Sequence, residues 1–384
     1  MTFIDFFFWA GYYLKCLFNI IFSYLSNVNT IKRYLSFKNV SIKQFIKHNK
    51  IKYKKNKKIN DYFYIVKLSG SYYSMGKQYG YKTKFILKKD IYTIYNFIEK
   101  NKSIFIKKIP NKYKGKTIFI ALKNYYNDVY NYLNPDIINF IKGICDAINI
   151  DFDILMGINL FSDLTDNHCI LLSKSINNKL LNIRTLDFGM PLLTQFLIVF
   201  KPRNKIPYIS LNPSVFCGCY SGISAKNLFF GESYYDILLS KQSIIGMPFH
   251  HLSHKILSES SNLEEAEELL KKMDRKSNLQ LLISDAKHSK LFLSGKDVCT
   301  TQQNSRTNNT VYSVTPNEQE NFDKNFHYLT DIDTIINTFI PNTRSGELHI
   351  FISYDGYIYV SVTTKLFQSY NNDFYKFSIT SLLK

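Results

Sequence analysis

The pattern of the chain changes at Cys169, and this change constrains the fold more than any other feature. Before it, apolar residues recur at helical spacing over about 71–100 and 119–149, after one strand-like run at 62–70. After it, short apolar runs between turn residues indicate strands, with one helical segment at 248–273. Neither an internal repeat nor a strand–helix alternation is present. This segregation predicts an α+β fold.

The segment that begins at Cys169 is predicted to be a β-hairpin. Two apolar runs flank Asn177 and Asn178, and asparagine tolerates the left-handed conformation that tight turns require. A two-residue turn places Cys169 opposite Leu186, whereas a three-residue loop places it opposite Asp187. In both registers Cys169 and Asp187 are neighbours at the open end of the hairpin.

The proton acceptor for Cys169 is the main chemical question. A nearby carboxylate raises a thiol's pKa, and the His168 side chain leaves the other side of the strand. The α-amine of Cys169 titrates near neutral pH, but it exists only if the bond after His168 is cut. Asp187 would then hold the ammonium, and Arg184 would offer donors to a carbonyl or carboxylate. The alternative is an ordinary buried cysteine, the commoner role of a free thiol.

A series of short motifs follows a fixed order along the chain. They lie at 70–80, 137–149, 153–159, 169, 184–188, 218–223 and 246–266. In order and spacing they resemble the family of acyl-CoA:6-aminopenicillanic acid acyltransferase. That family is a branch of the N-terminal nucleophile hydrolases, related to choloylglycine hydrolases and acid ceramidase-like amidases. The resemblance extends over about residues 65–365.

The resemblance implies a four-layer αββα sandwich, self-cleavage before the nucleophile, and two cleaved chains that stay associated. It assigns Cys169 as the nucleophile and new N-terminus, and it matches Arg184 and Asp187 to the paired residues that follow. Arg344, in the segment before the apolar run 348–353, resembles the family's late arginine.

The resemblance also shows departures at the expected oxyanion contact. Tyr220 and Val314 stand where relatives carry asparagine. Asn227 or a backbone N–H is therefore expected to contact the oxyanion.

Together these residues predict an autoproteolytic cysteine amidohydrolase or acyltransferase. Cys169 attacks the carbonyl of an N-acyl amide or an acyl thioester such as an acyl-CoA, and its own amine transfers the proton. We expect no cofactor and no metal. The alternative is a member without catalysis that keeps the fold as a membrane-bound scaffold or binding protein.

The N-terminal part divides into a hydrophobic helix and a basic linker. Residues 1–27 are apolar and long enough to span a bilayer or to lie in its interface, and residues 28–60 form the linker. By the positive-inside tendency, the body is expected on the cytoplasmic face of a membrane. A helix packed on the domain is the alternative. Residues 61–168 then form a helical pro-segment, or α chain, and 169–384 a catalytic β chain.

Basic charge is concentrated in one stretch. Residues 31–120 hold 24 Lys or Arg and three Asp or Glu, in a chain of 384 residues with a net charge of +19. Such a stretch suggests a membrane surface or a nucleic acid. No nucleic-acid motif accompanies it, so no nucleic-acid partner is expected. The codon bias of a chain rich in Lys, Asn, Ile, Phe and Tyr is an equally good explanation.

Two other clusters resemble metal or redox sites. His250 and His254 have the i,i+4 spacing of zinc ligands, but no glutamate follows His250. Cys217 and Cys219 alternate on a predicted strand. We expect the start of a helix and core packing, respectively.

Overall fold

The structure, a computed structural model, describes most of the chain from Lys57 onward, which belongs to the compact unit Lys55–Lys384. The predicted hydrophobic helix 1–27 and the linker up to residue 56 lie outside the described residues. Among the helices that are described, none combines the length and apolarity needed to cross a membrane. The described residues are 57–103, 105, 117–162, 169–234, 245–275, 279–295, 299–302, 310–314 and 316–384.

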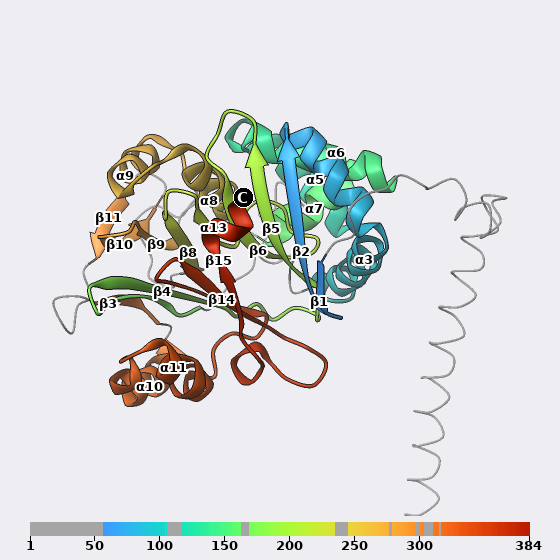
Figure 1. Cartoon of the computed structure of the whole chain (residues 1–384). Coiled ribbons are helices and arrows are strands. Elements are labelled where there is room, and N and C mark those ends of the chain that lie inside the picture. The colour runs from blue at the N-terminus through green and yellow to red at the C-terminus, as the bar shows by residue number, and fades with distance from the viewer. Residues whose placement is uncertain are drawn as a thin grey trace, which may run out of the picture. The chain divides into compact units, whose positions relative to one another are not determined.

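Two sheets face each other in the described part of the chain (Figure 1). In the larger sheet, the neighbouring strands Phe63–Gly70 and Gln195–Pro202 are parallel, and all other neighbouring strands are antiparallel. In spatial order its strands are β1 (Lys57–Asn60), β2 (Phe63–Gly70), β5 (Gln195–Pro202), β6 (Tyr208–Pro213), β7 (Ser221–Ser224), β8 (Phe229–Tyr234), β9 (Leu279–Ser284), β10 (Ser289–Ser294) and β11 (Cys299–Gln302). β1 lies within the stretch that was predicted to be linker.

The smaller sheet is antiparallel throughout. In spatial order its strands are β12 (Thr310–Ser313), β3 (Leu171–Ile176), β4 (Lys179–Leu186), β13 (His349–Tyr354), β14 (Tyr357–Val362) and β15 (Tyr375–Ser378).

The hairpin of β3 and β4 has the two-residue turn that the sequence allowed. Leu171 pairs with Arg184, and every following pair keeps this register. Asn177 and Asn178 have φ angles of 50° and 61°, the left-handed values that a tight hairpin turn of this kind needs. Cys169 therefore lies in line with Leu186, and Asp187 is the next residue.

Helices cover the outer faces of both sheets (Figure 1). Against the larger sheet lie α3 (Tyr72–Lys100), α5 (Ile118–Val129), α6 (Pro135–Ile148), α7 (Phe152–Ser162), α8 (Phe249–Glu259) and α9 (Leu263–Lys272). Against the smaller sheet lie α10 (Pro316–Asn325), α11 (Ile332–Thr334), the π-helical turn η4 (Ile335–Phe339) and α12 (Ile340–Thr343). Shorter elements are η2 (Tyr130–Tyr132), η3 (Phe326–Tyr328), η5 (Ser369–Asn371) and α13 (Ile379–Leu383).

Three buried clusters define the layers. One packs α3, α6 and neighbouring helices on one face of the larger sheet, through residues such as Ile198. A second fills the space between the sheets, where Leu197 of β5 and Phe351 of β13 lie. The third packs the smaller sheet, for example Ile183, against α10–α12. The order helix–sheet–sheet–helix agrees with the predicted layers.

Close contact between α3 and α6 depends on two glycines from the sequence motifs. A Cβ at Gly76 would lie 2.0 Å from the carbonyl oxygen of Phe140, and one at Gly143 would lie 2.1 Å from that of Tyr73. Backbones can approach this closely only without side chains. These motif glycines therefore fix the helix layer on which the larger sheet rests.

Helix boundaries agree with the sequence in most places. The predicted break at Asn134 separates α5 from α6, and Asn134 caps α6 by accepting a hydrogen bond from the backbone of Asp136. The predicted helical segment 248–273 is two helices, α8 and α9. The helices over 316–343 contradict the expectation of strands there. They bury Phe322, Ile335, Phe339 and Ile340 against the smaller sheet.

Candidate active site

Cys169 lies two residues before β3, at the open end of the hairpin, with no solvent exposure. The pairing with β4 continues past the end of β3, because the N–H of Ile170 donates to Thr185 Oγ1 at 2.8 Å and its carbonyl accepts from the N–H of Thr185. The Cys169 carbonyl accepts from the hydroxyl of Ser233 at 3.4 Å. The predicted nucleophile is thus held by strands of both sheets.

The environment of the thiol favours its protonated form. Burial raises the pKa of Cys169, and the charges of Glu232 and Asp187 raise it further, while Arg184 and a hydrogen bond from the Asp187 backbone lower it. Burial is the largest of these effects. In the uncut chain the thiol is therefore a poor nucleophile.

Arg184 projects from β4 into the space between the sheets and is fully buried. Its Nη2 lies 3.4 Å from Glu232 Oε2, and its Nε donates to the Glu232 carbonyl at 3.3 Å. Nη1 donates to Ser221 Oγ at 3.2 Å and lies 3.5 Å from His349 Nε2. The sequence predicts donors to a carbonyl or carboxylate, and in the structure Nε and Nη2 face the backbone carbonyl and the carboxylate of Glu232. Arg184 therefore acts on Cys169 through its charge.

Asp187 is held by the segment between α12 and β13. One carboxylate oxygen accepts from the backbone N–H groups of Gly346 and Glu347 at 2.7 and 2.6 Å, and the other from the Ser345 hydroxyl at 2.5 Å. Burial raises the pKa of Asp187 to about 7, with help from the charge of Glu318, although these three donors act in the opposite direction. The site has a carboxyl that changes charge near neutral pH.

Arg344 directs a backbone segment to the site but keeps its own side chain outside. It ends α12 in the left-handed conformation, with φ of 55°, and is exposed. The residues directly after it supply the donors to Asp187. The structure therefore brings Cys169, Arg184 and Asp187 together, and it leaves the Arg344 guanidinium outside the buried cluster.

Asn227 lies at the wrong end of the hairpin for an oxyanion contact. It is exposed in the turn between β7 and β8 and lines a cavity of about 220 Å³ with Asn178 and Lys179. Eight strand positions separate this turn end from Cys169, which at ~3.3 Å per residue is roughly 25 Å. The expectation for Asn227 is therefore wrong.

The two residues at asparagine positions of the resembled family pack in the interior. Tyr220 is fully buried and donates to Ser162 Oγ at 2.6 Å. Val314 is partly buried against the core between the smaller sheet and α10–α12. The Tyr220 hydroxyl is thus engaged by Ser162, and the Val314 side chain has no polar group.

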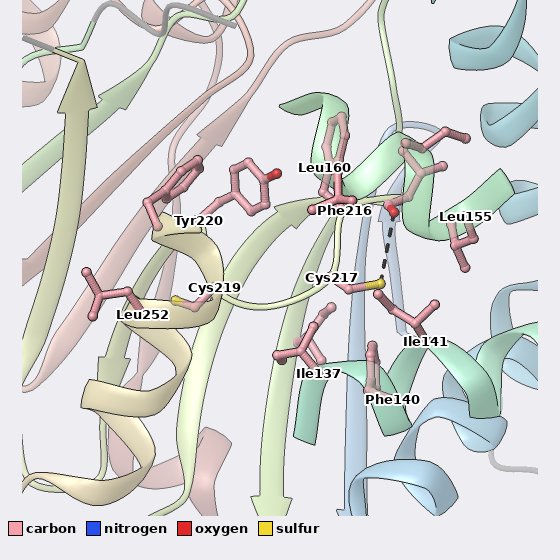
Figure 2. Close-up of a cluster of buried hydrophobic side chains, with 14 of the residues drawn as sticks. Ile137, Phe140, Ile141, Leu155, Leu160, Phe216, Cys217, Cys219, Tyr220 and Leu252 are labelled. Atoms are coloured by element: carbon pink, nitrogen blue, oxygen red, sulfur yellow. Dashed lines mark hydrogen bonds between the residues drawn. The ribbon is translucent and has the colours of Figure 1, made fainter. Parts of the chain in front are cut away.

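The cysteine pair and the histidines of α8 are structural. Figure 2 shows the Cys217 thiol among Ile137, Phe140 and Ile141, with the Cys219 thiol next to Leu252. Burial raises the pKa of both thiols. The histidines are buried at the start of α8, as expected from the sequence. No group of His, Cys, Asp and Glu in the described part of the chain is arranged to hold a metal ion.

Sequence reasoning missed Glu232, Ser221 and His349. All three are buried, and Glu232 and His349 lie on strands that also carry several apolar residues. A charged or imidazole side chain in such a strand needs a buried partner, and this signal could have identified Glu232 and His349. The partners themselves could not be predicted, because they lie on different strands.

The sequence matches no family model and no curated protein. Among solved structures, a mutant form of conjugated bile acid hydrolase from Clostridium perfringens aligns with a TM-score of 0.36 and 13% identity, over 56% of this chain and 94% of that one. The Caenorhabditis elegans ortholog of N-acylethanolamine-hydrolyzing acid amidase gives a TM-score of 0.39 and 10% identity, over 48% and 92%. Penicillin V acylase from Agrobacterium tumefaciens gives 0.34 and 11%, over 55% and 86%. Because these scores are below 0.5, the fold and site rest on the contacts described above.

Proposed function

We propose that this chain is a cysteine amidohydrolase or acyltransferase of the N-terminal nucleophile type, activated by cleavage before Cys169. The observation that supports the proposal is the meeting of Cys169, Arg184 and Asp187 at one end of the β3–β4 hairpin. The sequence motifs single out the same three residues. The substrate is an N-acyl amide or an acyl thioester.

Cleavage supplies the base that the uncut chain lacks. The new α-amine of Cys169 takes the thiol proton, and the thiolate attacks the acyl carbonyl. The ammonium then gives its proton to the leaving amine or thiol, and an acyl thioester of Cys169 remains. Water or an acceptor amine attacks this thioester, transfers a proton to the α-amine, and regenerates the thiol as the acyl product leaves.

The two charged partners have separate roles. The donors of Arg184 are occupied by Glu232 and Ser221. Arg184 therefore stabilises the thiolate by its positive charge and not by a hydrogen bond. Asp187 binds the ammonium, and the ammonium in turn lowers the pKa of Asp187 and keeps it ionised. The carboxylate thus becomes fully charged only after cleavage has produced its partner.

The location of the substrate follows from the N-terminal part of the chain. Residues 1–27 and the basic stretch that precedes β1 would hold the enzyme at the cytoplasmic face of a membrane. An N-acyl lipid or a related acyl amine would then be within reach of the site. The cleaved chains would stay associated, because the helices before Cys169 form one face of the core with strands that follow it.

The second candidate function is a binding protein without catalysis. It is favoured by the sealed position of Cys169 and by the engagement of the Arg184 donors within the protein. The two functions differ in whether the thiol ever becomes reactive.

The test is a search for the acyl-enzyme. Purified protein is incubated with N-acyl amides of increasing chain length, and intact mass is measured after an acid quench. The enzyme predicts a fragment 169–384 heavier by one acyl group, in the wild type and in Cys219→Ala, which removes another buried free thiol. Cys169→Ala should show no adduct. Absence of any adduct and of any released acid across the series would favour the binding protein.

A further inference from the structure

A buried chain of polar side chains connects the two sheets beside Arg184. Gln195 of β5, His349 of β13, Ser221 of β7 and Arg184 of β4 are each at most 1% exposed. His349 Nδ1 lies 3.0 Å from Gln195 Oε1, and its Nε2 lies 2.9 Å from Ser221 Oγ. Burying four polar side chains is costly unless each is hydrogen-bonded. In this buried row of side chains, every hydrogen-bond donor therefore needs an acceptor.

The partners determine which ring nitrogen of His349 carries the proton. Gln195 Nε2 donates to the carbonyl of Leu193 at 3.3 Å, so Oε1 is the atom that faces the ring. A carbonyl oxygen only accepts, so Nδ1 must carry hydrogen. Nε2 then presents its lone pair, to which the Ser221 hydroxyl and the Nη1 of Arg184 both point. Two donors around Nε2 agree with this assignment.

The same assignment orients Arg184. Because the Ser221 hydrogen goes to His349, the lone pairs of Ser221 Oγ remain available to Nη1 at 3.2 Å. Glu232 holds Nη2 and Nε on the other side. The imidazole stays neutral, since burial and the charge of Arg184 lower the pKa of His349 well below its usual value.

We propose that His349 is a positioning residue, whose neutral Nδ1–H form holds Ser221 and Arg184 so that the guanidinium charge lies beside Cys169. The hydrogen-bond assignment stands by itself. Its catalytic consequence rests on the proposed function, because only a reacting thiol benefits from a fixed positive charge.

The first test needs no activity. Nitrogen chemical shifts of ¹⁵N-labelled histidine are recorded in uncut Cys169→Ala protein, and His349→Gln identifies the signal of His349. We expect the Nδ1–H neutral form, in contrast to the Nε2–H form common in solution, without titration between pH 5 and 9. An Nε2–H form, or titration near the usual histidine value, would overturn the proposal.

The second test uses a matched pair of substitutions on the cleaved protein. His349→Gln places a carbonyl oxygen where Nε2 lies and can still accept from Ser221, whereas His349→Asn reaches only the Gln195 side. His288→Gln, at an exposed histidine, is the control. With the N-acyl amide that gives the acyl-enzyme as substrate, we expect His349→Asn to lower kcat more than about tenfold with KM within about twofold, and His349→Gln to restore most of the kcat.

Equal losses in both His349 variants, or wild-type kcat in His349→Asn, would contradict the positioning role. The alkylation rate of Cys169 against pH gives an independent reading. In His349→Asn the thiolate should appear at higher pH than in the other proteins, because the positive charge is less well placed. Wild-type protein that shows the Nδ1–H form and no turnover would refute the proposed function and keep the assignment.

Discussion

Asp187→Asn should remove a pH dependence of folding that the uncut chain owes to one carboxyl. The folded state raises the pKa of Asp187 from 3.8 to about 7. Between these two pH values the folded protein keeps the proton on Asp187, whereas the unfolded chain has released it. Stability from this group is complete below pH 4 and is lost as pH rises through 7. The change from carboxylate to amide keeps the shape of the side chain and removes the titration.

The magnitude follows from the size of the shift. About three pKa units at 1.36 kcal/mol each correspond to about 4 kcal/mol between pH 4 and pH 8. The side chain retains some solvent exposure, so this is the upper end. The assay is urea unfolding of Cys169→Ala and of Cys169→Ala with Asp187→Asn, at intervals across this range.

The difference in unfolding free energy between the two proteins should change steadily across the range, with Asp187→Asn relatively more stable at high pH. Asp355→Asn, at an exposed carboxylate, controls for the chemical change itself. A constant difference between the two proteins would refute the reasoning about Asp187. In cleaved wild-type protein the dependence should be weaker, because the ammonium of Cys169 lowers the pKa of its partner.

Three further substitutions test the packing around the site, each by urea unfolding. Glu232→Gln leaves the Arg184 charge buried without its carboxylate and should cost about 3–5 kcal/mol, so a loss below 1 kcal/mol would argue against the pair. Gly76→Ala should cost about 1–3 kcal/mol because α3 and α6 must separate to make room for the added methyl group. Gly189→Ala is the control, since a Cβ there would meet open space, and a similar cost for both substitutions would contradict the close approach of the helices. Tyr220→Phe should cost about 1 kcal/mol, and no change would mean that its bond to Ser162 is not formed.

The sequence predicts those features that local chemistry determines. The sequence predicts the turn at Asn177 and Asn178, and both registers that this turn allows make Cys169 and Asp187 neighbours; the structure has the two-residue turn. Motif glycines such as Gly76 mark the contact between α3 and α6. The change from helical to strand patterns at Cys169 predicts the α+β class, whereas the layer order is implied only by the family resemblance.

Contacts between side chains on strands far apart in the sequence could not be predicted from the sequence. Glu232 and His349 meet Arg184 from β8 and β13, and nothing near Arg184 in the sequence indicates them. Asn227 was misplaced because a strand has two ends, and the sequence around a turn does not say which end faces the nucleophile.

The most direct measurement is the mass of the purified chain. Intact mass and N-terminal sequencing should find a fragment that begins at Cys169 in the wild type and in Cys219→Ala, and only the uncut chain in Cys169→Ala. An uncut wild-type chain after prolonged incubation, or a cut at another residue, would contradict the account.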